Sequence, residues 1–393
     1  MPDARTLELV RSTLPAIRDA GPAVTEYFYQ RMFRHHPELK NVFNMTHQQN
    51  GQQPAALFGA LCAYGAHLDT PQALQDAVER IAQKHTSLNI RPEQYAIVGE
   101  HLLATLRELL DPGEEVLAAW AEVYGVLADI FIRREAAIYQ QGAQQSGGWQ
   151  GDRPFVITQV VEESNGIKSF VLTPQDGLPV PDVIAGQYVT VSIQPPEWEY
   201  RQLRQYSLTR PSAGKNYRIA VRHQPHGKVS GWFHQQARCG DSILLSVPSG
   251  DFRLQDSQTP QPVTLISAGS GLTPMLAMLH QLAESRYPAR VNWWHGTTDP
   301  SNHAFAEEVT SLGAQLEHFS QQTWYSQRVV NSEAYCSGRM NIGQFSSDTI
   351  AADGHYYLCG PADFMQSILA QLTARGISRD RIHYEMFGPH QTL

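Results

Sequence analysis

A histidine lies on an apolar helical stripe in the N-terminal part of the chain, where an imidazole could bind a metal ion. His85 follows Leu74, Val78 and Ile81, and precedes Leu88, at spacings that alternate between four and three residues. That periodicity predicts a helix whose apolar side faces a protein core. Two interpretations of His85 stay open here. It is either a core histidine that hydrogen-bonds a neighbour or an axial ligand of haem iron in an apolar pocket.

Two further polar residues on apolar helical stripes bear on this choice. Tyr95 begins one stripe, and Glu135 lies four residues after Phe131 on another. A carboxylate that faces a core is costly unless it is paired, and a ligating histidine commonly donates its second ring N–H to such a group. Glu135 beside His85 would satisfy both requirements. The alternative is that Glu135 turns outward, beside the two arginines that precede it.

A second group of residues suits a flavin nucleotide. In Arg204-Gln205-Tyr206-Ser207, the alternation of an extended strand points Arg204 and Tyr206 to one side. Arginine can neutralise a diphosphate, an aromatic ring can stack, and a hydroxyl can hydrogen-bond a ring nitrogen. Tyr188 opens another apolar run, and Gly227-Lys228-Val229-Ser230 is typical of a helix start whose free amides receive phosphate. Ser230 is equally typical of a simple helix cap.

A third pattern suits a pyrophosphate. The apolar run 263–267 leads into Ala268-Gly269-Ser270-Gly271-Leu272-Thr273-Pro274. Glycines let the backbone approach a pyrophosphate, and proline fits the first turn of a helix because its missing N–H is not needed there. This strand–GxGxTP–helix pattern differs from the Rossmann GxGxxG motif. Near the C-terminus another strand ends at Cys359-Gly360-Pro361, where an inert buried thiol is an open alternative for Cys359.

Changes of pattern along the chain predict the elements that position these residues. Helical stripes separated by glycine and proline breakers predict an all-α domain over residues 1–139, and a polar, glycine-rich stretch predicts a linker over 140–151. Short alternating runs predict an antiparallel β-barrel over 152–258. Strands that alternate with helices predict an α/β domain with a parallel sheet over 259–393.

Composition and charge narrow the classes of function. The chain has 393 residues, of which 42% are hydrophobic and 17% charged, so we expect an ordinary globular protein of several domains. A net charge of −8 argues against nucleic-acid binding. The apolar runs are too short for a transmembrane segment, and the N-terminus lacks the pattern of a secretory signal. The four cysteines show no tight spacing, so we expect a cytoplasmic protein with reduced thiols.

The helical residues carry a resemblance to the globin domain of the bacterial flavohaemoglobins, in which a globin is fused to a ferredoxin-reductase-like module. The resemblance includes the segment 37–43, the pair Lys84-His85, and most of the chain. It implies that His85 is the proximal iron ligand of haem b, hydrogen-bonded in a triad with Tyr95 and Glu135. It also implies roles in the pocket for four other residues. Tyr29 and Gln53 would contact bound oxygen, Leu57 would shape the pocket, and Phe43 would stack on the porphyrin; on its own, Tyr29 is an ordinary core aromatic.

The two later domains resemble the FAD and NAD(P)H domains of the ferredoxin-reductase superfamily. The resemblance implies that FAD lies on a six-stranded barrel at Tyr188 and at the segments 204–207 and 227–230. It implies that NADH or NADPH binds the loop 268–273 and lies near Cys359 and Gly360. The segment Tyr384-Glu385-Met386-Phe387-Gly388-Pro389 matches a family segment that covers the flavin, where Glu385 and Lys84 influence cofactor potentials. Apart from the resemblance, Arg286 and Arg290 are either candidates for contact with a 2′-phosphate or ordinary solvated surface arginines.

The family resemblance implies a nitric oxide dioxygenase that detoxifies NO. Two NO, two O₂ and one NAD(P)H would give two nitrate ions, with electrons passed from the nucleotide through FAD to haem. The expected partners are therefore these small molecules, and we expect a monomer. Two alternatives stay open: a haem-based sensor of O₂ or NO, and an NAD(P)H-dependent flavin or ferric reductase.

Overall fold

The computed structural model forms two compact units. It describes residues 2–43, 45, 51–67, 74–256, 259–327, 335–346 and 349–388. One unit comprises residues 1–145, 149–152 and 192–204, and the other comprises 146–148, 153–191 and 205–393. Among the described residues, none of the helices combines the length and the apolar character that a membrane crossing requires. The predicted three-domain boundaries remain predictions.

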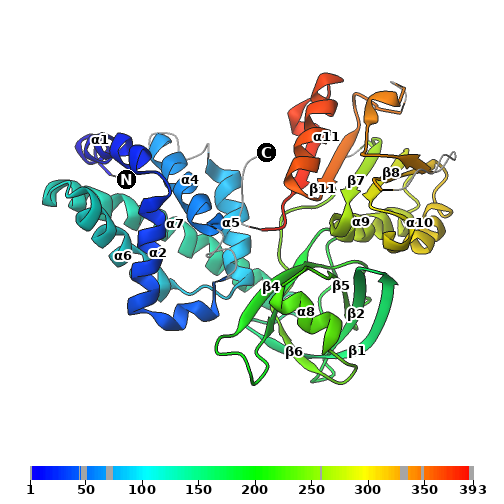
Figure 1. Cartoon of the computed structure of the whole chain (residues 1–393), viewed down its shortest axis with the longest axis horizontal. Coiled ribbons are helices and arrows are strands. Elements are labelled where there is room, and N and C mark those ends of the chain that lie inside the picture. The colour runs from blue at the N-terminus through cyan, green and yellow to red at the C-terminus, as the bar shows by residue number, and fades with distance from the viewer. Residues whose placement is uncertain are drawn as a thin grey trace. The chain divides into compact units, whose positions relative to one another are not determined.

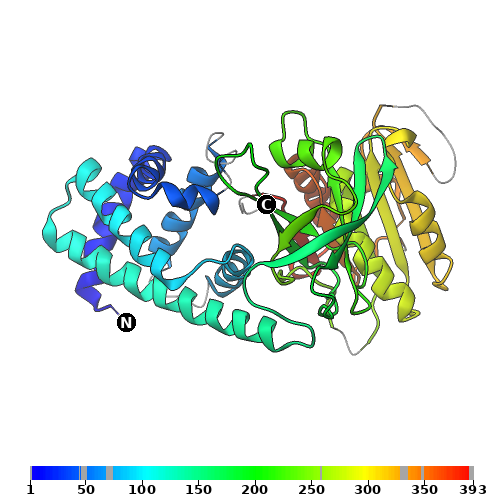
Figure 2. The ribbon, with the colours of Figure 1, turned by 90° about the horizontal axis from the view of Figure 1, so that it is seen from below.

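The first unit is helical, as the stripes predict (Figure 1). Its elements are α1 (Ala4–Ala20), α2 (Ala23–His35), the 3₁₀ turn η1 (Pro37–Asn41), α4 (Gln52–Ala66), α5 (Gln75–Ser87), α6 (Pro92–Leu110) and α7 (Glu114–Gln144). Helix α7 is the long helix seen in Figure 2, and it packs against α1, α5 and α6. Buried Val10, Leu14, Trp120 and Val123 join α1 to α7 in one apolar cluster. This packing places residues of α5, α6 and α7 close together.

Helix α7 continues further than the sequence pattern suggests. It ends at Gln144, so the first five residues of the predicted linker, 140–144, are helical rather than extended. Glutamine and alanine are good helix formers, and this composition lets the helix run on without an apolar stripe. A polar composition alone therefore did not mark the end of the helix.

The second unit contains most of an antiparallel sheet, of which residues 192–193 and 202–204 are grouped with the first unit. Its strands are β1 (Arg153–Ser164), β2 (Ile167–Pro174), β3 (Tyr188–Ile193), β4 (Gln202–Ser207), β5 (Tyr217–Arg222) and β6 (Ser242–Leu245), in the order β4-β3-β6-β1-β2-β5. The pairs β1–β2, β1–β6 and β2–β5 are antiparallel. A bridge between Leu208, directly after β4, and Ile219 in β5 joins the two edges of the sheet. The antiparallel class is therefore confirmed, and helix α8 (Lys228–Gln235) follows β5.

A parallel sheet completes the second unit. Its strands are β7 (Val263–Ala268), β8 (Val291–Thr297), β9 (Phe319–Tyr325), β10 (Tyr335–Ser337), β11 (His355–Cys359) and β12 (Ile382–Glu385), in the order β10-β9-β8-β7-β11-β12. The connecting elements are η3 (Gly269–Gly271), α9 (Leu272–Glu284), η4 (Pro300–Asn302), α10 (Ala306–Gly313), η5 (Ile342–Gln344), α11 (Ala362–Ala374) and η6 (Arg379–Arg381). Successive residues of β7 point to opposite faces and enter two different apolar clusters, Leu265 with α9 and Ile266 with α11. Helices thus cover both faces, as the predicted βαβ pattern requires.

One glycine before β3 has no room for a side chain. Gly186 has a φ of +104°, and a Cβ built on it would lie 1.8 Å from the carbonyl oxygen of Phe252. A left-handed backbone already strains other residues, and here backbone would have to move as well.

We expect Gly186→Ala to lower the free energy of unfolding of the second unit by about 3 kcal/mol or more, because strain and a backbone clash combine. Gly231→Ala in α8 is the matched control, since open space surrounds that position. The control should be neutral or stabilising by up to about 1 kcal/mol. Urea denaturation followed by circular dichroism measures both. Equal stability of the two variants would contradict the packing described for Gly186.

Candidate functional site

Three polar side chains from three helices meet in the core of the first unit. His85 Nδ1 lies 2.8 Å from Glu135 Oε1 and 2.9 Å from the Tyr95 hydroxyl, and Tyr95 donates to the same Glu135 oxygen at 2.5 Å. Glu135 is only 3% exposed, so the alternative in which it turns outward is wrong. The carboxylate oxygen is the common acceptor of this group, which we call the proximal triad.

The proximal triad determines which ring nitrogen of His85 carries the proton. A carboxylate only accepts hydrogen bonds, so the Nδ1 atom of His85 must donate to Glu135. In a neutral imidazole the lone pair then lies on Nε2. Within the described part of the chain, no hydrogen bond reaches Nε2, and the His85 side chain is 33% exposed. An unprotonated, accessible imidazole nitrogen with a carboxylate behind it has the properties of a metal ligand.

Local sequence explains why Tyr95 reaches His85. Helix α5 ends at Ser87, Asn89 takes a left-handed φ of +56°, and the N–H of Ile90 returns to the carbonyl of His85. Pro92 then starts α6, one turn before Tyr95. Burial and the hydrogen bond to Glu135 raise the pKa of Tyr95 far above its ordinary value. Tyr95 therefore stays a neutral hydroxyl that can donate to the carboxylate.

A second set of predicted residues gathers around α2 of the same unit. Tyr29 is buried, and Gln53 Nε2 donates to its hydroxyl oxygen at 3.4 Å. Phe43 packs edge-on against the Tyr29 ring with centroids 5.7 Å apart, and Leu57 lies against the same apolar cluster. The structure thus brings Tyr29, Gln53, Phe43 and Leu57 together. Two polar groups surrounded by aliphatic and aromatic side chains suit a small, weakly polar ligand beside a hydrophobic ring.

The predicted flavin residues lie where strands and a helix begin or end. Arg204, Gln205, Tyr206 and Ser207 are the last four of the six residues of β4, and Tyr188 opens β3. Tyr206 packs edge-on against Phe233 of α8 at 5.7 Å, so β4 and the helix that begins after Gly227 are neighbours. No side chain caps the start of α8, where Lys228, Val229 and Ser230 form the first turn. The hydroxyl of Ser230 instead accepts from the Gln224 amide and donates to the Gly227 carbonyl.

The glycine loop lies against the end of β11. Ala268 ends β7, and Gly269, Ser270 and Gly271 form η3 before Leu272 and Thr273 start α9. A Cβ on Gly271 would lie 2.1 Å from the carbonyl oxygen of Cys359 and 2.7 Å from the Gly360 nitrogen. Glycine is therefore required for this approach of two loops. The residues predicted for NAD(P)H binding thus meet at the carboxyl edge of the parallel sheet, where ligands of such sheets bind.

Cys359 and the C-terminal segment adjoin this edge. Cys359 is fully buried, and burial, followed by the charge of Glu385, raises the pKa of its thiol well above the ordinary value. Glu385 ends β12 and is paired in register with Cys359. Met386 is partly buried and packs against the apolar cluster that contains residues of α11. Phe387 is about half exposed, and Gly388 has a φ of +143°. Pro389 lies outside the described residues.

Lys84 and Glu385 belong to different units. Lys84 lies in α5, directly before His85, and its carbonyl accepts from the Ser87 hydroxyl. Glu385 lies in the second unit. A joint influence of the two residues on cofactor potentials remains a prediction.

Two candidates for a 2′-phosphate contact are at the wrong edge of the sheet. Arg286 follows the C-terminus of α9, and Arg290 directly precedes β8. Because β7 and β8 are parallel, both arginines lie at the amino edge, opposite the glycine loop. This part of the prediction is wrong, since composition could not indicate which edge a surface arginine occupies.

Arg222 is a residue that the sequence patterns did not single out. It ends β5, and one of its guanidinium nitrogens would lie 2.8 Å from a Cβ built on Gly269. A cation of the antiparallel sheet therefore stands over the glycine loop of the parallel sheet. Only its alternation with Arg218 on β5 hinted at a special position, and such alternation is common on strand surfaces.

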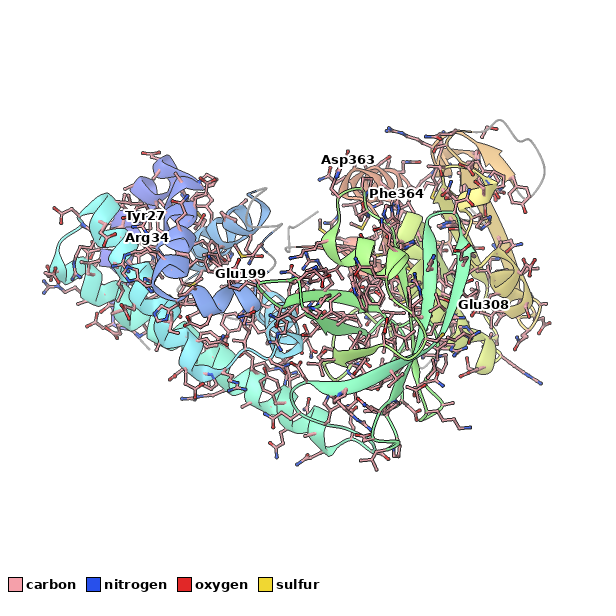
Figure 3. The ribbon with its side chains drawn as sticks, turned by 60° about the horizontal axis from the view of Figure 1, so that its bottom comes forward. Tyr27, Arg34, Glu199, Glu308, Asp363 and Phe364 are labelled. Carbon is pink, nitrogen blue, oxygen red and sulfur yellow. The ribbon has the colours of Figure 1, made fainter. Side chains whose placement is uncertain are left out.

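We expect Tyr95→Phe to destabilise the first unit by about 1–3 kcal/mol, because the buried Glu135 carboxylate loses one of its donors. Tyr27→Phe is the matched control. Tyr27, labelled in Figure 3, donates to Glu108 at 2.7 Å in an exposed hydrogen bond, and its loss should cost under about 0.5 kcal/mol. Chemical denaturation of both variants measures the difference. Similar losses for the two would show that the proximal triad contributes no more than a surface contact.

Comparisons with protein families match two parts of the chain. Residues 26–131 match the model described as "Globin", and residues 265–369 match the model described as "Oxidoreductase NAD-binding domain". The globin match includes most of α2, His85, Tyr95 and most of α7. The NAD-binding match includes most of the parallel sheet. The helical unit and the parallel sheet therefore each have an independent family match.

One solved structure matches nearly the whole chain, and others match the reductase part. The chain is similar to a flavohaemoglobin of Malassezia yamatoensis with bound FAD and haem, at 28% identity and a TM-score of 0.89 over 98% of this chain and 99% of that one. It is also similar to the flavohaem-like FAD/NAD-binding domain of nitric oxide dioxygenase from Vibrio cholerae, at 40% identity and a TM-score of 0.56 over 60% of this chain and 99% of that one. A cytochrome P450 reductase of Amycolatopsis shares the reductase fold, at 24% identity and a TM-score of 0.53 over 62% of this chain and 73% of that one. With a globin and an NAD-binding oxidoreductase module on one polypeptide, the chain belongs to the flavohaemoglobin family.

Proposed function

We propose that this chain is a nitric oxide dioxygenase, which converts NO and O₂ to nitrate with electrons from NAD(P)H. The observation that carries the proposal is the His85–Glu135 hydrogen bond of 2.8 Å, which leaves Nε2 of the imidazole accessible. A simple core histidine needs no carboxylate behind it. The relatives named above support the reductase half of the reaction, because one of them binds both FAD and haem.

The donor set fits haem b, FAD and NAD(P)H. His85 Nε2 would hold iron, the β4 segment with Tyr188 and the start of α8 would hold FAD, and the loop 268–273 would hold the nucleotide. When bound, these groups supply a hydride donor, a flavin that accepts two electrons and releases them singly, and an iron centre that takes one electron at a time. Such a series reconciles a two-electron reductant with one-electron chemistry.

The proximal triad would keep the imidazole basic and fixed in orientation. Glu135 accepts a hydrogen bond from the Nδ1–H group of His85 and so increases the electron density that His85 can donate through Nε2. Tyr95 shares the same carboxylate oxygen and prevents it from turning away. A strongly donating imidazole favours oxygen activation over simple reversible carriage. The charge of Glu135 is thus the part of the triad that distinguishes an enzyme from an oxygen carrier.

Tyr29 and Gln53 would orient the small-molecule substrates. Gln53 donates to the Tyr29 oxygen, and a hydroxyl can accept one hydrogen bond while it donates another. With a ligand bound, the Tyr29 hydroxyl would donate to a partly negative oxygen atom, where a hydrogen bond to developing charge is stronger than an ordinary one. The aromatic and aliphatic neighbours exclude water from the same place.

We expect the purified protein to form nitrate from NO in air only when NAD(P)H is present. His85→Ala should abolish nitrate formation while NAD(P)H-dependent reduction of ferricyanide continues, because the second unit does not need the imidazole. His36→Ala, which changes a partly exposed histidine of the same unit, is the control and should keep both activities. Nitrate formation by His85→Ala at the wild-type rate would exclude the proposal and favour a flavin or ferric reductase.

We expect Glu135→Gln to slow NO turnover about tenfold or more, because the amide keeps the shape of the carboxylate but not its charge. Resonance Raman spectroscopy of the reduced haem protein should show a lower iron–histidine stretching frequency. Glu108→Gln, which removes an exposed carboxylate of α6, should change neither quantity. If both the frequency and the turnover of Glu135→Gln match the wild type, the triad does not act through the imidazole.

A further inference from the structure

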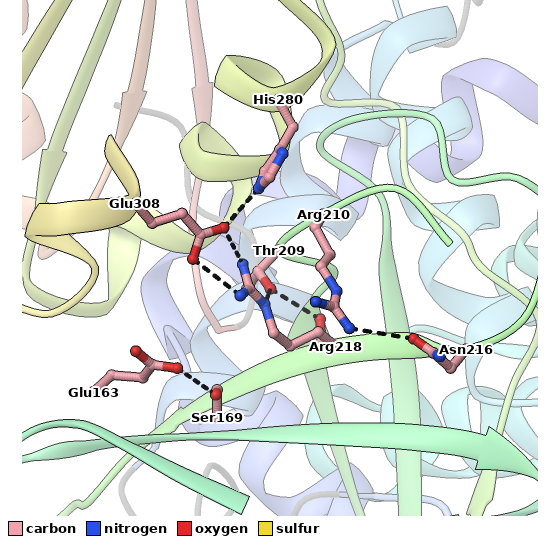
Figure 4. A network of polar contacts seen from close by, with 8 residues as sticks. All are labelled: Glu163, Ser169, Thr209, Arg210, Asn216, Arg218, His280 and Glu308. Carbon is pink, nitrogen blue, oxygen red and sulfur yellow. Dashed lines mark hydrogen bonds and ion pairs between the residues drawn. The ribbon is translucent and has the colours of Figure 1, made fainter. Parts of the chain in front are cut away.

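An ion pair joins the antiparallel sheet to the parallel sheet within the second unit. Arg218 on β5 donates to both oxygens of Glu308 on α10, at 2.9 Å and 2.6 Å, and His280 Nε2 on α9 lies 2.6 Å from Glu308 Oε1 (Figure 4). Arg218 Nε also donates to the hydroxyl of buried Thr209 at 2.7 Å. We call Arg218, Glu308, His280 and Thr209 the latch.

The latch is largely withdrawn from water. The side chain of Arg218 is 10% exposed, that of His280 18%, and that of Glu308 26%. The guanidinium of Arg218 also lies 5.1 Å from the ring centroid of Phe305, a cation–π contact at the start of α10. Burial alone would raise the pKa of Glu308, but hydrogen bonds from His280 and Arg218 outweigh it and lower the pKa to about 2. Glu308 is therefore charged throughout the physiological range.

Other charged groups around the latch have their own partners. Glu163 accepts from the Ser169 hydroxyl at 2.5 Å, and Arg210 donates to Asn216 at 3.4 Å (Figure 4). Burial raises the pKa of Glu163 and lowers that of Arg210. Neither group makes a hydrogen bond to Glu308 in the described structure. The two-pronged contact with Arg218 is thus specific to one carboxylate.

Each end of the latch continues into a segment with a proposed cofactor role. Thr209 comes two residues after Ser207, the last residue of the predicted flavin segment on β4. His280 lies on α9, the helix that begins directly after the glycine loop. The latch therefore ties the strand proposed to hold the flavin to the helix proposed to hold the nucleotide.

Other contacts between the two parts include a hydrogen bond from the Asn165 N–H to the Ser301 carbonyl and an apolar cluster. Ile167, Ala185 and Ala220 of the antiparallel part share one buried cluster with Met275 and Leu279 of α9. Apolar contacts are not directional, so they allow small sliding movements at low cost. A planar guanidinium that binds both oxygens of a carboxylate keeps its geometry only at one relative position of the two elements that carry the pair. Buried ion pairs generally add little net stability, which makes a role in geometry the better explanation here.

We propose that the latch of Arg218, Glu308, His280 and Thr209 positions the nucleotide-binding part of the chain against the flavin-binding part for hydride transfer. This inference rests on the proposed function. In that reaction the C4–H bond of the dihydronicotinamide breaks and an N–H bond forms at the flavin. Two electrons pass from nucleotide to flavin, and a proton from water completes the reduced flavin. The rate depends steeply on the distance between the two rings, which the latch controls from outside the site.

Two variants test the latch, and one neighbouring residue provides the control. Glu308→Gln keeps the shape of the side chain but removes its charge. Arg218→Lys keeps the charge but removes the planar group whose two nitrogens bind both oxygens of the carboxylate. Glu307→Gln makes the same change as the first variant at an exposed position of the same helix. Flavin content, melting temperature and hydrogen–deuterium exchange of the α10 amides are measured first, on the full chain. Anaerobic stopped-flow then gives the rate of flavin reduction per bound flavin at saturating NADH or NADPH, with ordinary and C4-deuterated nucleotide.

We expect both latch variants to bind flavin as the wild type does, yet to reduce it about tenfold or more slowly, with a full deuterium isotope effect. Exchange at the α10 amides should rise in both, and Glu307→Gln should match the wild type throughout. Wild-type rates per bound flavin in both latch variants would overturn the proposal while leaving the proposed function intact. Loss of flavin from both variants would also overturn it, since the contacts would then hold the fold and not the geometry. If neither nucleotide reduces the wild-type flavin, the proposed function fails together with the latch.

Discussion

The structure of the helical unit depends on one buried carboxylate. An unpaired charge in a protein interior costs several kcal/mol, so Glu135 is tolerated only with donors in place. Those donors come from α5 and α6, while Glu135 belongs to α7. The last turn of α5, the first turn of α6 and an interior turn of α7 are thus held together at one point. The left-handed turn at Asn89 and the proline that starts α6 are the local features that let the chain meet this requirement.

The second unit also has a carboxylate, Glu308, that accepts hydrogen bonds from an imidazole and from a second side chain. Glu135 and Glu308 each accept from an imidazole and from one further donor. In the first case the imidazole is contacted through Nδ1 and keeps Nε2 accessible. In the second it is contacted through Nε2, and a guanidinium donates to both oxygens of the carboxylate. The same pairing therefore leaves a ligand atom available in one unit and consumes every oxygen of the carboxylate in the other.

Periodicity predicted the elements with strong patterns and missed those without. A clear apolar period extends over the whole of helix α11, Ala362–Ala374, and an alternating apolar run covers the whole of strand β3, Tyr188–Ile193. Strand β9 was missed, because its serine and glutamines interrupt the apolar run of a buried parallel strand. Strands β10 and β12, with three and four residues, are too short to show any period. Pairing with a neighbouring strand of the parallel sheet, which a sequence pattern does not report, defines such strands.

The residues of the two carboxylate sites differ in how far sequence alone could identify them. His85 and Glu135 stood out because each is a polar residue on an apolar helical face, and such a residue needs a partner. Arg218 and Glu308 lie 90 residues apart on a strand and a short helix, and each also fits an ordinary solvated surface position. Only the meeting of β5 with α10 buries them together. Spacing along one element can reveal that a polar side chain faces a core, whereas the identity of a partner on a distant element follows from the topology of the chain.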